Sequence, residues 1–320
     1  MKKTGIKIVK QLQDRGFEAY FAGGFVRDMI LGRDSKDIDI ATSATPEEVE
    51  KIFKKTIDIG KKFGVMIVVE NGINFEVTTF RSESEYSKNR RPKSVSFTSA
   101  EVDSKRRDFT INALFYDPVT NKTIDYVGGV EDIKKRTLRF IGDPLERISE
   151  DHLRLIRAIR FKTTLNFQYD QATFDAVRKH SQLIKSVAAE RVRDELNRIL
   201  TSKNRHTALI ELSDSKLLKE ILPEIEAMKS VPQPSQYHQE GDVFTHTYLA
   251  LKSLPDDSDL RLCWATLLHD VGKPPTIIRE KERIIFHDHA KVSADTSNKI
   301  KRRLNFSNTD KQAVLFLVHN

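Results

Sequence analysis

The stretch "GRDSKDIDIAT", residues 32–42, carries two aspartates, Asp37 and Asp39, on either side of one isoleucine. Residues two apart on an extended strand project from the same face, so these carboxylates are expected to point the same way. Such a pair suits Mg²⁺, which prefers oxygen ligands and shares them with substrate phosphates. The same spacing also fits the solvated face of an edge strand, and the pair alone does not decide between these interpretations.

A glycine pair and an arginine lie just upstream, in "FAGGFVRDMILG". Gly23 and Gly24 follow a strand-like run and precede a helical pattern, which lets backbone N–H groups approach phosphate oxygens closely. Arg27 lies one turn into that helix, where its guanidinium can reach a triphosphate. Because this phosphate cradle adjoins Asp37 and Asp39, the combination favours a two-metal site for nucleotidyl transfer.

The overall composition is that of a globular protein, with 38% hydrophobic and 31% charged residues. The net charge of +8 favours a polyanionic partner, nucleic acid above all. Cys263 is the only cysteine, which excludes an internal disulfide and a cysteine-based zinc cluster. The first residues lack the apolar core of a signal peptide, and runs such as "VMIVV" are too short to span a bilayer. We therefore expect a cytoplasmic protein without membrane association.

Strand-like and helical runs alternate up to about residue 145, and the strand signal then disappears. This pattern predicts a mixed α+β domain over residues 1–145, a helical domain over 146–228 and another helical domain over 229–320. The final run, "KQAVLFLVHN", stops without a helix terminator, so we expect the third domain to be truncated.

One continuous helix is predicted for "PLERISEDHLRLIRAIRFKTTL", residues 144–165. At 100° per residue, one arc of about 120° on this helix holds Glu150, Asp151, Arg154 and Arg157. Acids and arginines on one face can match the donors and acceptors of a nucleobase. The alternative is a ladder of salt bridges on a solvated surface.

Four motifs, in order, resemble those of class II tRNA nucleotidyltransferases, the CCA-adding enzymes and their poly(A) polymerase relatives. The first is "GGFVRDMILGRDSKDIDIAT", followed by "RRDFTINAL" at residues 106–114. The third and fourth are "EDHLRLIRAIRF" at 150–161 and "ERVRDELNRIL" at 190–200. The resemblance implies an α+β fold: a polymerase-beta-like nucleotidyltransferase head with a small mixed sheet, an all-α neck and an HD-type helical domain.

The resemblance also implies an activity, the template-independent addition of CTP and then ATP to the 3′ end of tRNA, with release of pyrophosphate. Asp37 and Asp39 match the catalytic residues that hold Mg²⁺. Positions that match nucleotide-binding residues are Gly23, Gly24, Arg27, Arg107, Asp108, Asp151, Arg154, Arg157 and Arg160. Within this set, Asp151 and Arg154 match the pair that selects cytosine and adenine, and Arg160 lies at the flank of the arc described above.

The segment between the first two motifs bears on the kind of activity. "SEYSKNRRPKS", residues 84–94, matches a mobile loop that is shortened in relatives adding only the cytidines, and its full length favours CCA or terminal A addition. "IGKKFGVMIVV", residues 59–69, resembles the CCA-adding branch more than the poly(A) polymerases. Glu76 either supplies a third acid near the metal or is an ordinary residue on the strand surface.

The third domain contains histidines and an aspartate that resemble the metal-binding set of HD domains: His246, His269, Asp270 and His289. Imidazoles and a carboxylate suit a divalent transition metal, here Ni²⁺ or Mn²⁺. Asp288 and Ala290 replace the glycine and glutamate of the usual "GHE", which speaks against phosphohydrolase activity. The alternatives to CCA addition are an enzyme that adds only the terminal A, a poly(A) polymerase and an HD phosphohydrolase. The sequence does not predict the oligomeric state.

Overall fold

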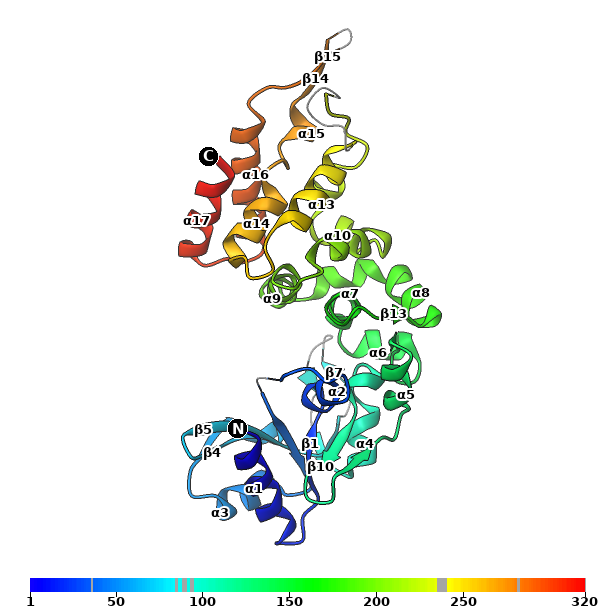
Figure 1. The fold of residues 1–320 in the computed structure, drawn as a ribbon, viewed down its shortest axis with the longest axis vertical. Helices are drawn as coiled ribbons and strands as arrows, with labels where there is room; N and C mark the ends of the chain where they lie inside the picture. Colours follow the sequence, from blue (N-terminus) through cyan, green and yellow to red (C-terminus); the bar gives the residue numbers. More distant parts are fainter. Residues whose placement is uncertain are drawn as a thin grey trace. The chain divides into compact units, whose positions relative to one another are not determined.

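The computed structural model describes residues 1–35, 37–83, 86–87, 91–92, 95–234, 241–280 and 283–319 (Figure 1). The chain forms two compact units. The first consists of Met1–Asp151 and Gln168–Thr173, and the second of His152–Phe167 and Phe174–Asn320.

A seven-stranded mixed sheet forms the centre of the first unit, in the order β11-β10-β1-β2-β5-β4-β3. Only β2 and β5 run parallel among these neighbours, with Ile40 opposite Val77, and this confirms the predicted mixed sheet. The strands are β1 Ala19–Ala22, β2 Asp39–Thr42, β3 Thr56–Gly60, β4 Val65–Glu70, β5 Ile73–Thr79, β10 Phe115–Asp117 and β11 Lys122–Ile124.

Helices α1, α2 and α3 contact this sheet. The helices of the first unit are α1 Lys2–Gln13, α2 Gly24–Ile30, α3 Pro46–Ile52, α4 Ala100–Lys105, α5 Gly129–Lys134 and α6 Pro144–Glu150. Helix α3 begins with a capping box, in which the Thr45 hydroxyl accepts from the Glu48 N–H and the Glu48 carboxylate accepts from the Thr45 N–H. Strand β6 (Arg81–Glu83) pairs with β9 (Val95–Phe97), and β7 (Tyr86–Ser87) pairs with β8 (Arg91–Pro92). The loop predicted for residues 84–94 lies mostly outside the described residues.

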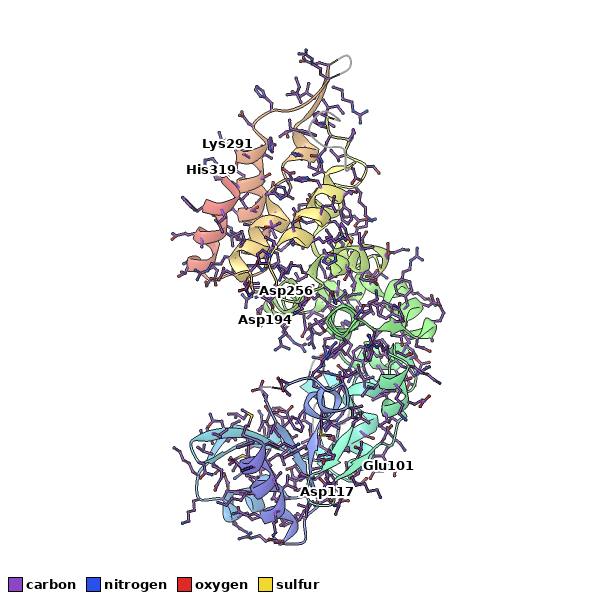
Figure 2. All side chains as sticks on the ribbon, viewed as in Figure 1. Glu101, Asp117, Asp194, Asp256, Lys291 and His319 are labelled. Carbon is purple, nitrogen blue, oxygen red and sulfur yellow. The ribbon has the colours of Figure 1, made fainter. Side chains whose placement is uncertain are left out.

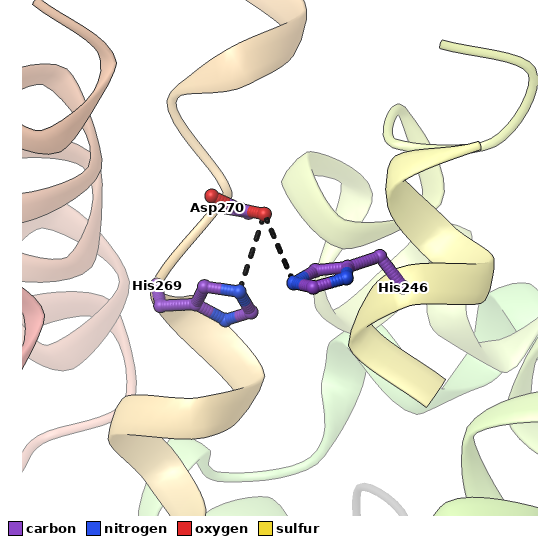
Figure 3. A group of neighbouring side chains, drawn as sticks. All are labelled: His246, His269 and Asp270. Carbon is purple, nitrogen blue, oxygen red and sulfur yellow. Dashed lines mark ion pairs between the residues drawn. The ribbon is translucent and has the colours of Figure 1, made fainter. Parts of the chain in front are cut away.

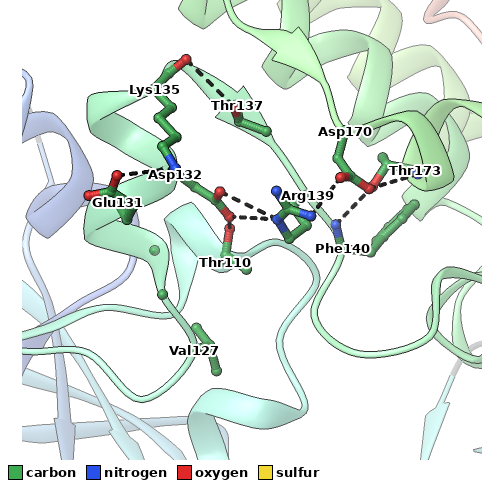
Figure 4. A network of polar contacts seen from close by, with 12 residues as sticks. Thr110, Val127, Glu131, Asp132, Lys135, Thr137, Arg139, Phe140, Asp170 and Thr173 are labelled. Carbon is green, nitrogen blue, oxygen red and sulfur yellow. Dashed lines mark hydrogen bonds and ion pairs between the residues drawn. The ribbon is translucent and has the colours of Figure 1, made fainter.

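A six-residue segment from later in the chain, residues 168–173, completes the first unit (Figure 4). Strand β13 (Gln168–Tyr169) pairs in parallel with β12 (Thr137–Leu138). Arg139 Nη1 then donates to Asp170 Oδ1 at 2.6 Å, and the backbone N–H of Phe140 donates to Thr173 Oγ1 at 3.1 Å. The first unit is therefore discontinuous in sequence.

The second unit is mainly helical, and α7 packs against α9 and α10. Its helices are α7 Arg154–Leu165, α9 Ala189–Leu200, α10 Arg205–Asp214, α11 Leu217–Ile221, α12 Pro223–Glu226, α13 Val243–Ser253, α14 Leu260–Leu268, α15 Lys273–Thr276, α16 His289–Arg303 and α17 Asn308–His319, with α8 Gln171–Lys179 entering it from the first unit. The hairpin of β14 (Ile277–Glu280) and β15 (Arg283–Phe286) corrects the prediction that strands end near residue 145.

The helix predicted for residues 144–165 is broken. Helix α6 ends at Glu150, Asp151 has an extended backbone with φ −148° and ψ 105°, and α7 begins at Arg154. A tertiary contact lies at the break: a ring nitrogen of His152 is 2.6 Å from Ser186 Oγ. The prediction that Asp151 and Arg154 share one helical face is therefore wrong. Among the described residues, no helix is long and apolar enough to cross a membrane.

Candidate active site

Acidic side chains gather where β2 begins, beside β5. Asp39 is the first residue of β2, and Asp37 precedes the strand, which corrects the prediction that both lie on it. The buried side chain of Ile38 separates the two exposed aspartates. Because Ile40 lies opposite Val77, Glu76 comes to lie beside Asp39. The strand register thus brings a third carboxylate to the predicted pair.

The environment of Asp39 suits a cation. The residue as a whole is exposed, but protein atoms crowd its carboxyl group. This desolvation and the negative charge of Glu76 raise the pKa of Asp39 to about 6, with Asp37 adding to the shift and Arg107 opposing it. Acidic groups that repel one another are stabilised by a shared cation, and oxygen donors of this kind suit Mg²⁺. The site therefore fits the predicted metal.

Gly23 lies between β1 and α2 in a conformation that favours glycine. Its φ is 64°, and its N–H donates to the carbonyl oxygen of Leu114 at 3.0 Å. A Cβ atom at this position would lie 3.1 Å from Arg107 Nη1. Glycine at position 23 therefore allows both the turn and the close approach of Arg107.

Asn112 connects the other predicted nucleotide-binding residues of the first unit. Its Oδ1 accepts from Arg27 Nη1 at 2.6 Å, and its Nδ2 donates to Asp108 Oδ1 at 3.1 Å. Its backbone oxygen accepts from Arg107 Nη1 at 3.2 Å. This role was not predicted from the sequence, although Asn112 lies within the motif "RRDFTINAL", which was the available signal.

Arg27 is more constrained than predicted. It is 9% exposed, and its Nε and Nη2 donate to the carboxylate of the adjacent Asp28 at 2.9 and 3.0 Å. Together with the contact to Asn112, these bonds hold the guanidinium in one orientation. Arg27 is therefore preorganised, which lowers the entropic cost of binding a phosphate group.

The predicted arginines of the third motif belong to the second unit, and a buried acid on α9 contacts two of them. Glu195 is 4% exposed, and its carboxylate lies 2.5 Å from Arg160 Nε and 3.9 Å from Arg157 Nη1. Burial lowers the pKa of Arg160 to about 10, although the charge of Glu195 opposes the shift. Arg154, which is 8% exposed, begins α7, the helix that also carries Arg157 and Arg160. Asp151, by contrast, belongs to the first unit.

The histidines and aspartate of the predicted second metal site do come together (Figure 3). One potential ligand atom from each of His246, His269 and Asp270 lies within 4.8 Å of the others. His289 Nε2 lies 3.9 Å from Asp270 Oδ1. Two imidazoles and a carboxylate at this spacing fit a divalent transition metal.

Lys273, which was not predicted from the sequence, also contacts this cluster. Its Nζ lies 2.8 Å from Asp270 Oδ2, and its side chain is buried. Burial would raise the pKa of Asp270, but His269 and Lys273 outweigh it and hold that pKa below its ordinary range. The carboxylate therefore stays ionised and available as a ligand.

Three family models match successive parts of the chain. They are described as "Poly A polymerase head domain" over residues 19–139, "Probable RNA and SrmB- binding site of polymerase A" over 166–229 and "HD domain" over 242–320. Residues 1–18, 140–165 and 230–241 lie outside the matched segments.

Several known proteins are similar to the chain. The CCA-adding enzyme of Bacillus pumilus is 46% identical over 289 residues, which cover 90% of this chain and 67% of that protein. The CCA-adding enzyme of Ligilactobacillus salivarius is 41% identical over 277 residues, covering 85% and 63% respectively. The crystal structure of the Bacillus stearothermophilus CCA-adding enzyme with CTP is 31% identical, with a TM-score of 0.76, and the match covers 98% of this chain and 69% of that one. The chain thus spans roughly two thirds of the length of these relatives.

Proposed function

The chain belongs to the family of CCA-adding enzymes, and we propose that it adds CTP and then ATP to the 3′ end of tRNA without a template, releasing pyrophosphate. One observation carries the proposal. Asp37, Asp39 and Glu76 gather at the start of β2, beside β5, and the charge of Arg107, which lies next to Gly23, acts on Asp39. Acids for a metal and an arginine for phosphates are the two elements that nucleotidyl transfer needs.

In this proposal the head residues bind and orient the reactants. Asp37 and Asp39 hold Mg²⁺, which, when bound, neutralises phosphate charge and activates the attacking hydroxyl. The backbone of Gly23 and Gly24 cradles the triphosphate, and Arg27 adds a preorganised positive charge. Arg107 and Asp108 contact the phosphates and the ribose. Positioning and charge neutralisation then supply most of the rate enhancement.

Nucleotide choice is assigned to residues of the third motif. We assign the pairing edge of cytosine or adenine to Asp151 and Arg154, and further contacts with the nucleotide to Arg157 and Arg160. Uracil and guanine present other donor and acceptor patterns, so binding them would leave buried polar groups unpaired. Glu195 supports this role because it fixes Arg160 on α7.

The remaining assignments follow from the same activity. We propose a catalytic head over residues 1–145, a neck over 146–228 that selects the nucleotide and binds RNA, and an HD-type domain over 229–320. The net charge of +8 supports contacts with the tRNA backbone, which make binding dependent on salt. Acting on tRNA would place the protein in the cytoplasm. The cluster around Asp270 is proposed to bind Ni²⁺ or Mn²⁺.

The direct test supplies the protein with Mg²⁺ and three tRNAs, which end before CCA, after C and after CC. The proposal expects CTP incorporation on the first two and ATP incorporation on the third. Asp39→Asn should abolish incorporation without altering the melting temperature, while Asp34→Asn, an exposed acid in the same segment, should behave as the wild type. ATP incorporation on the third tRNA alone would indicate an A-adding enzyme, and long A tails a poly(A) polymerase. Incorporation by Asp39→Asn at the wild-type rate would refute the assignment of the site.

The HD cluster needs a separate experiment. Equilibrium dialysis with Ni²⁺ and Mn²⁺ should show one bound ion in the wild type and a loss of affinity in His269→Ala. Hydrolysis of a phosphomonoester that depends on this metal would favour the phosphohydrolase alternative, whereas equal binding by both proteins would refute the second site.

A further inference from the structure

Asp103, on α4, is a buried acid that none of the proposed chemical steps uses. Its side chain is 1% exposed, and each of its two oxygens accepts hydrogen bonds from a different arginine. Arg106 donates to Oδ1 from Nε at 2.9 Å and from Nη2 at 2.6 Å. Arg107 donates to Oδ2 from Nε at 3.2 Å and from Nη2 at 3.0 Å. Two charge-assisted bonds to each guanidinium fix its orientation as well as its position.

The guanidinium of Arg107 is held from its opposite side too. Its Nη1 donates to the backbone oxygen of Asn112 at 3.2 Å and lies 3.1 Å from the position of a Cβ at Gly23. Its central carbon lies 5.1 Å from the centre of the Phe115 ring. The contacts with Asp103 and Asn112 together hold Arg107 so that its Nη1 lies next to Gly23.

Asp103 also contacts β6, the strand that pairs with β9. The backbone N–H of Arg81, the first residue of β6, donates to Asp103 Oδ1 at 3.2 Å. The side chain of Arg81 donates through Nη1 to the carbonyl oxygen of Phe63. One buried carboxylate therefore joins the start of β6 to the arginine beside Gly23.

We propose that Asp103 is a positioning residue, which acts through Arg107 to fix the phosphate contact at Gly23 and joins that contact to the start of β6. The inference rests on the proposed function, which assigns Arg107 to the nucleotide. Asp103 is buried behind Arg107, so its effect on the substrate is indirect. Removing the carboxylate should displace the Arg107 guanidinium and leave the catalytic acids in place.

The test compares Asp103→Asn with Glu101→Gln, a change of the same kind at an exposed position of the same helix (Figure 2). Asp103→Asn should lower kcat/KM for CTP and ATP about 10- to 100-fold, mainly through KM, because a misdirected contact loses binding and alignment. Glu101→Gln should leave both constants unchanged. Once Arg107→Ala is present, adding Asp103→Asn should change kcat/KM less than about twofold. An unchanged KM in folded Asp103→Asn, or effects that multiply in the double variant, would overturn the proposal.

Two additions keep the result interpretable. Asp103→Asn removes the negative charge that lies between the guanidinium groups of Arg106 and Arg107, and the single variant can unfold for that reason. In that case the double variant Asp103→Asn/Arg106→Gln is compared with Arg106→Gln. Equilibrium binding of CTP is measured on the same proteins without tRNA. A wild type that binds CTP but extends no tRNA would refute the proposed function alone. Equal CTP binding by the wild type and the Asp103 variant would refute the positioning role alone.

Discussion

Glu195→Gln should destabilise the second unit strongly, because it removes the carboxylate that contacts Arg160 and Arg157. The Arg160 side chain is 13% exposed, so its charge would remain largely buried beside a neutral amide. Two unit charges 4 Å apart attract by about 4 kcal/mol at an effective dielectric constant of 20, and part of this offsets their desolvation. Breaking one side of a buried pair typically costs about 3–5 kcal/mol. We expect a loss of about 3 kcal/mol in the free energy of unfolding.

Thermal and urea unfolding measure this loss, which corresponds to a fall in melting temperature of roughly 10 °C at 2–4 °C per kcal/mol. Asp194→Asn is the matched control, since Asp194 precedes Glu195 on α9 and its side chain is 58% exposed (Figure 2). The control should change stability by less than about 0.5 kcal/mol. Adding Arg160→Met to Glu195→Gln should restore part of the loss by removing the stranded charge. A loss below about 1 kcal/mol, or a double variant less stable than Glu195→Gln, would refute the reasoning.

Three further predictions concern other residues. Gly272→Ala should lower the free energy of unfolding, measured by thermal melts, by about 1–3 kcal/mol. It should also weaken metal binding, because the added Cβ would lie 2.4 Å from the backbone oxygen of His289. Stability and metal affinity equal to those of the wild type would contradict this. Burial lowers the pKa of Lys301 from 10.5 to about 8. The buried charge therefore destabilises the folded state fully below pH 8, and this destabilisation disappears as the pH rises to 10.5. Lys301→Met should therefore melt higher than the wild type at pH 7, by an amount equivalent to at most ~3 kcal/mol, and the difference should shrink by pH 10; a constant difference would exclude this cause. Asp39 must lose its proton to bind a cation, so Mg²⁺ affinity, followed by titration calorimetry, should fall as the pH drops through about 6, and an unchanged affinity at pH 5 would argue against Asp39 as a ligand.

The sequence predicted features whose determinants are local. The start of α3 is an example of a local feature, because Thr45 and Glu48 form its capping box within one turn. The glycine pair and the mixed sheet were likewise predictable, because turn chemistry and strand periodicity are written in neighbouring residues. The family resemblance was confirmed for the same reason, since its motifs are contiguous.

Features set by distant contacts were missed. Residues 145–165 contain no proline or glycine, yet the helix breaks where His152 contacts Ser186. One local feature was overlooked as well, the β14–β15 hairpin, although the isoleucines of "IIREKERIIF" carried a usable signal. The anchoring role of Glu195 depends on which arginines of α7 pack against it, and no spacing rule supplies that information. The contacts of Asp103 were overlooked although Arg106 and Arg107 follow it by three and four residues, a spacing that brings side chains together on a helix.

The segment Gln168–Thr173 has a consequence for attempts to separate the two units. A polypeptide that ended at residue 151 would lack β13, so β12 would keep an unpaired edge and the N–H of Phe140 would lose its Thr173 acceptor. Arg139 would also lose Asp170. A single crossover between related genes at this position would therefore transplant an incomplete head. We expect functional chimaeras to need both junctions, with residues 168–173 inherited from the same parent as residues 1–151.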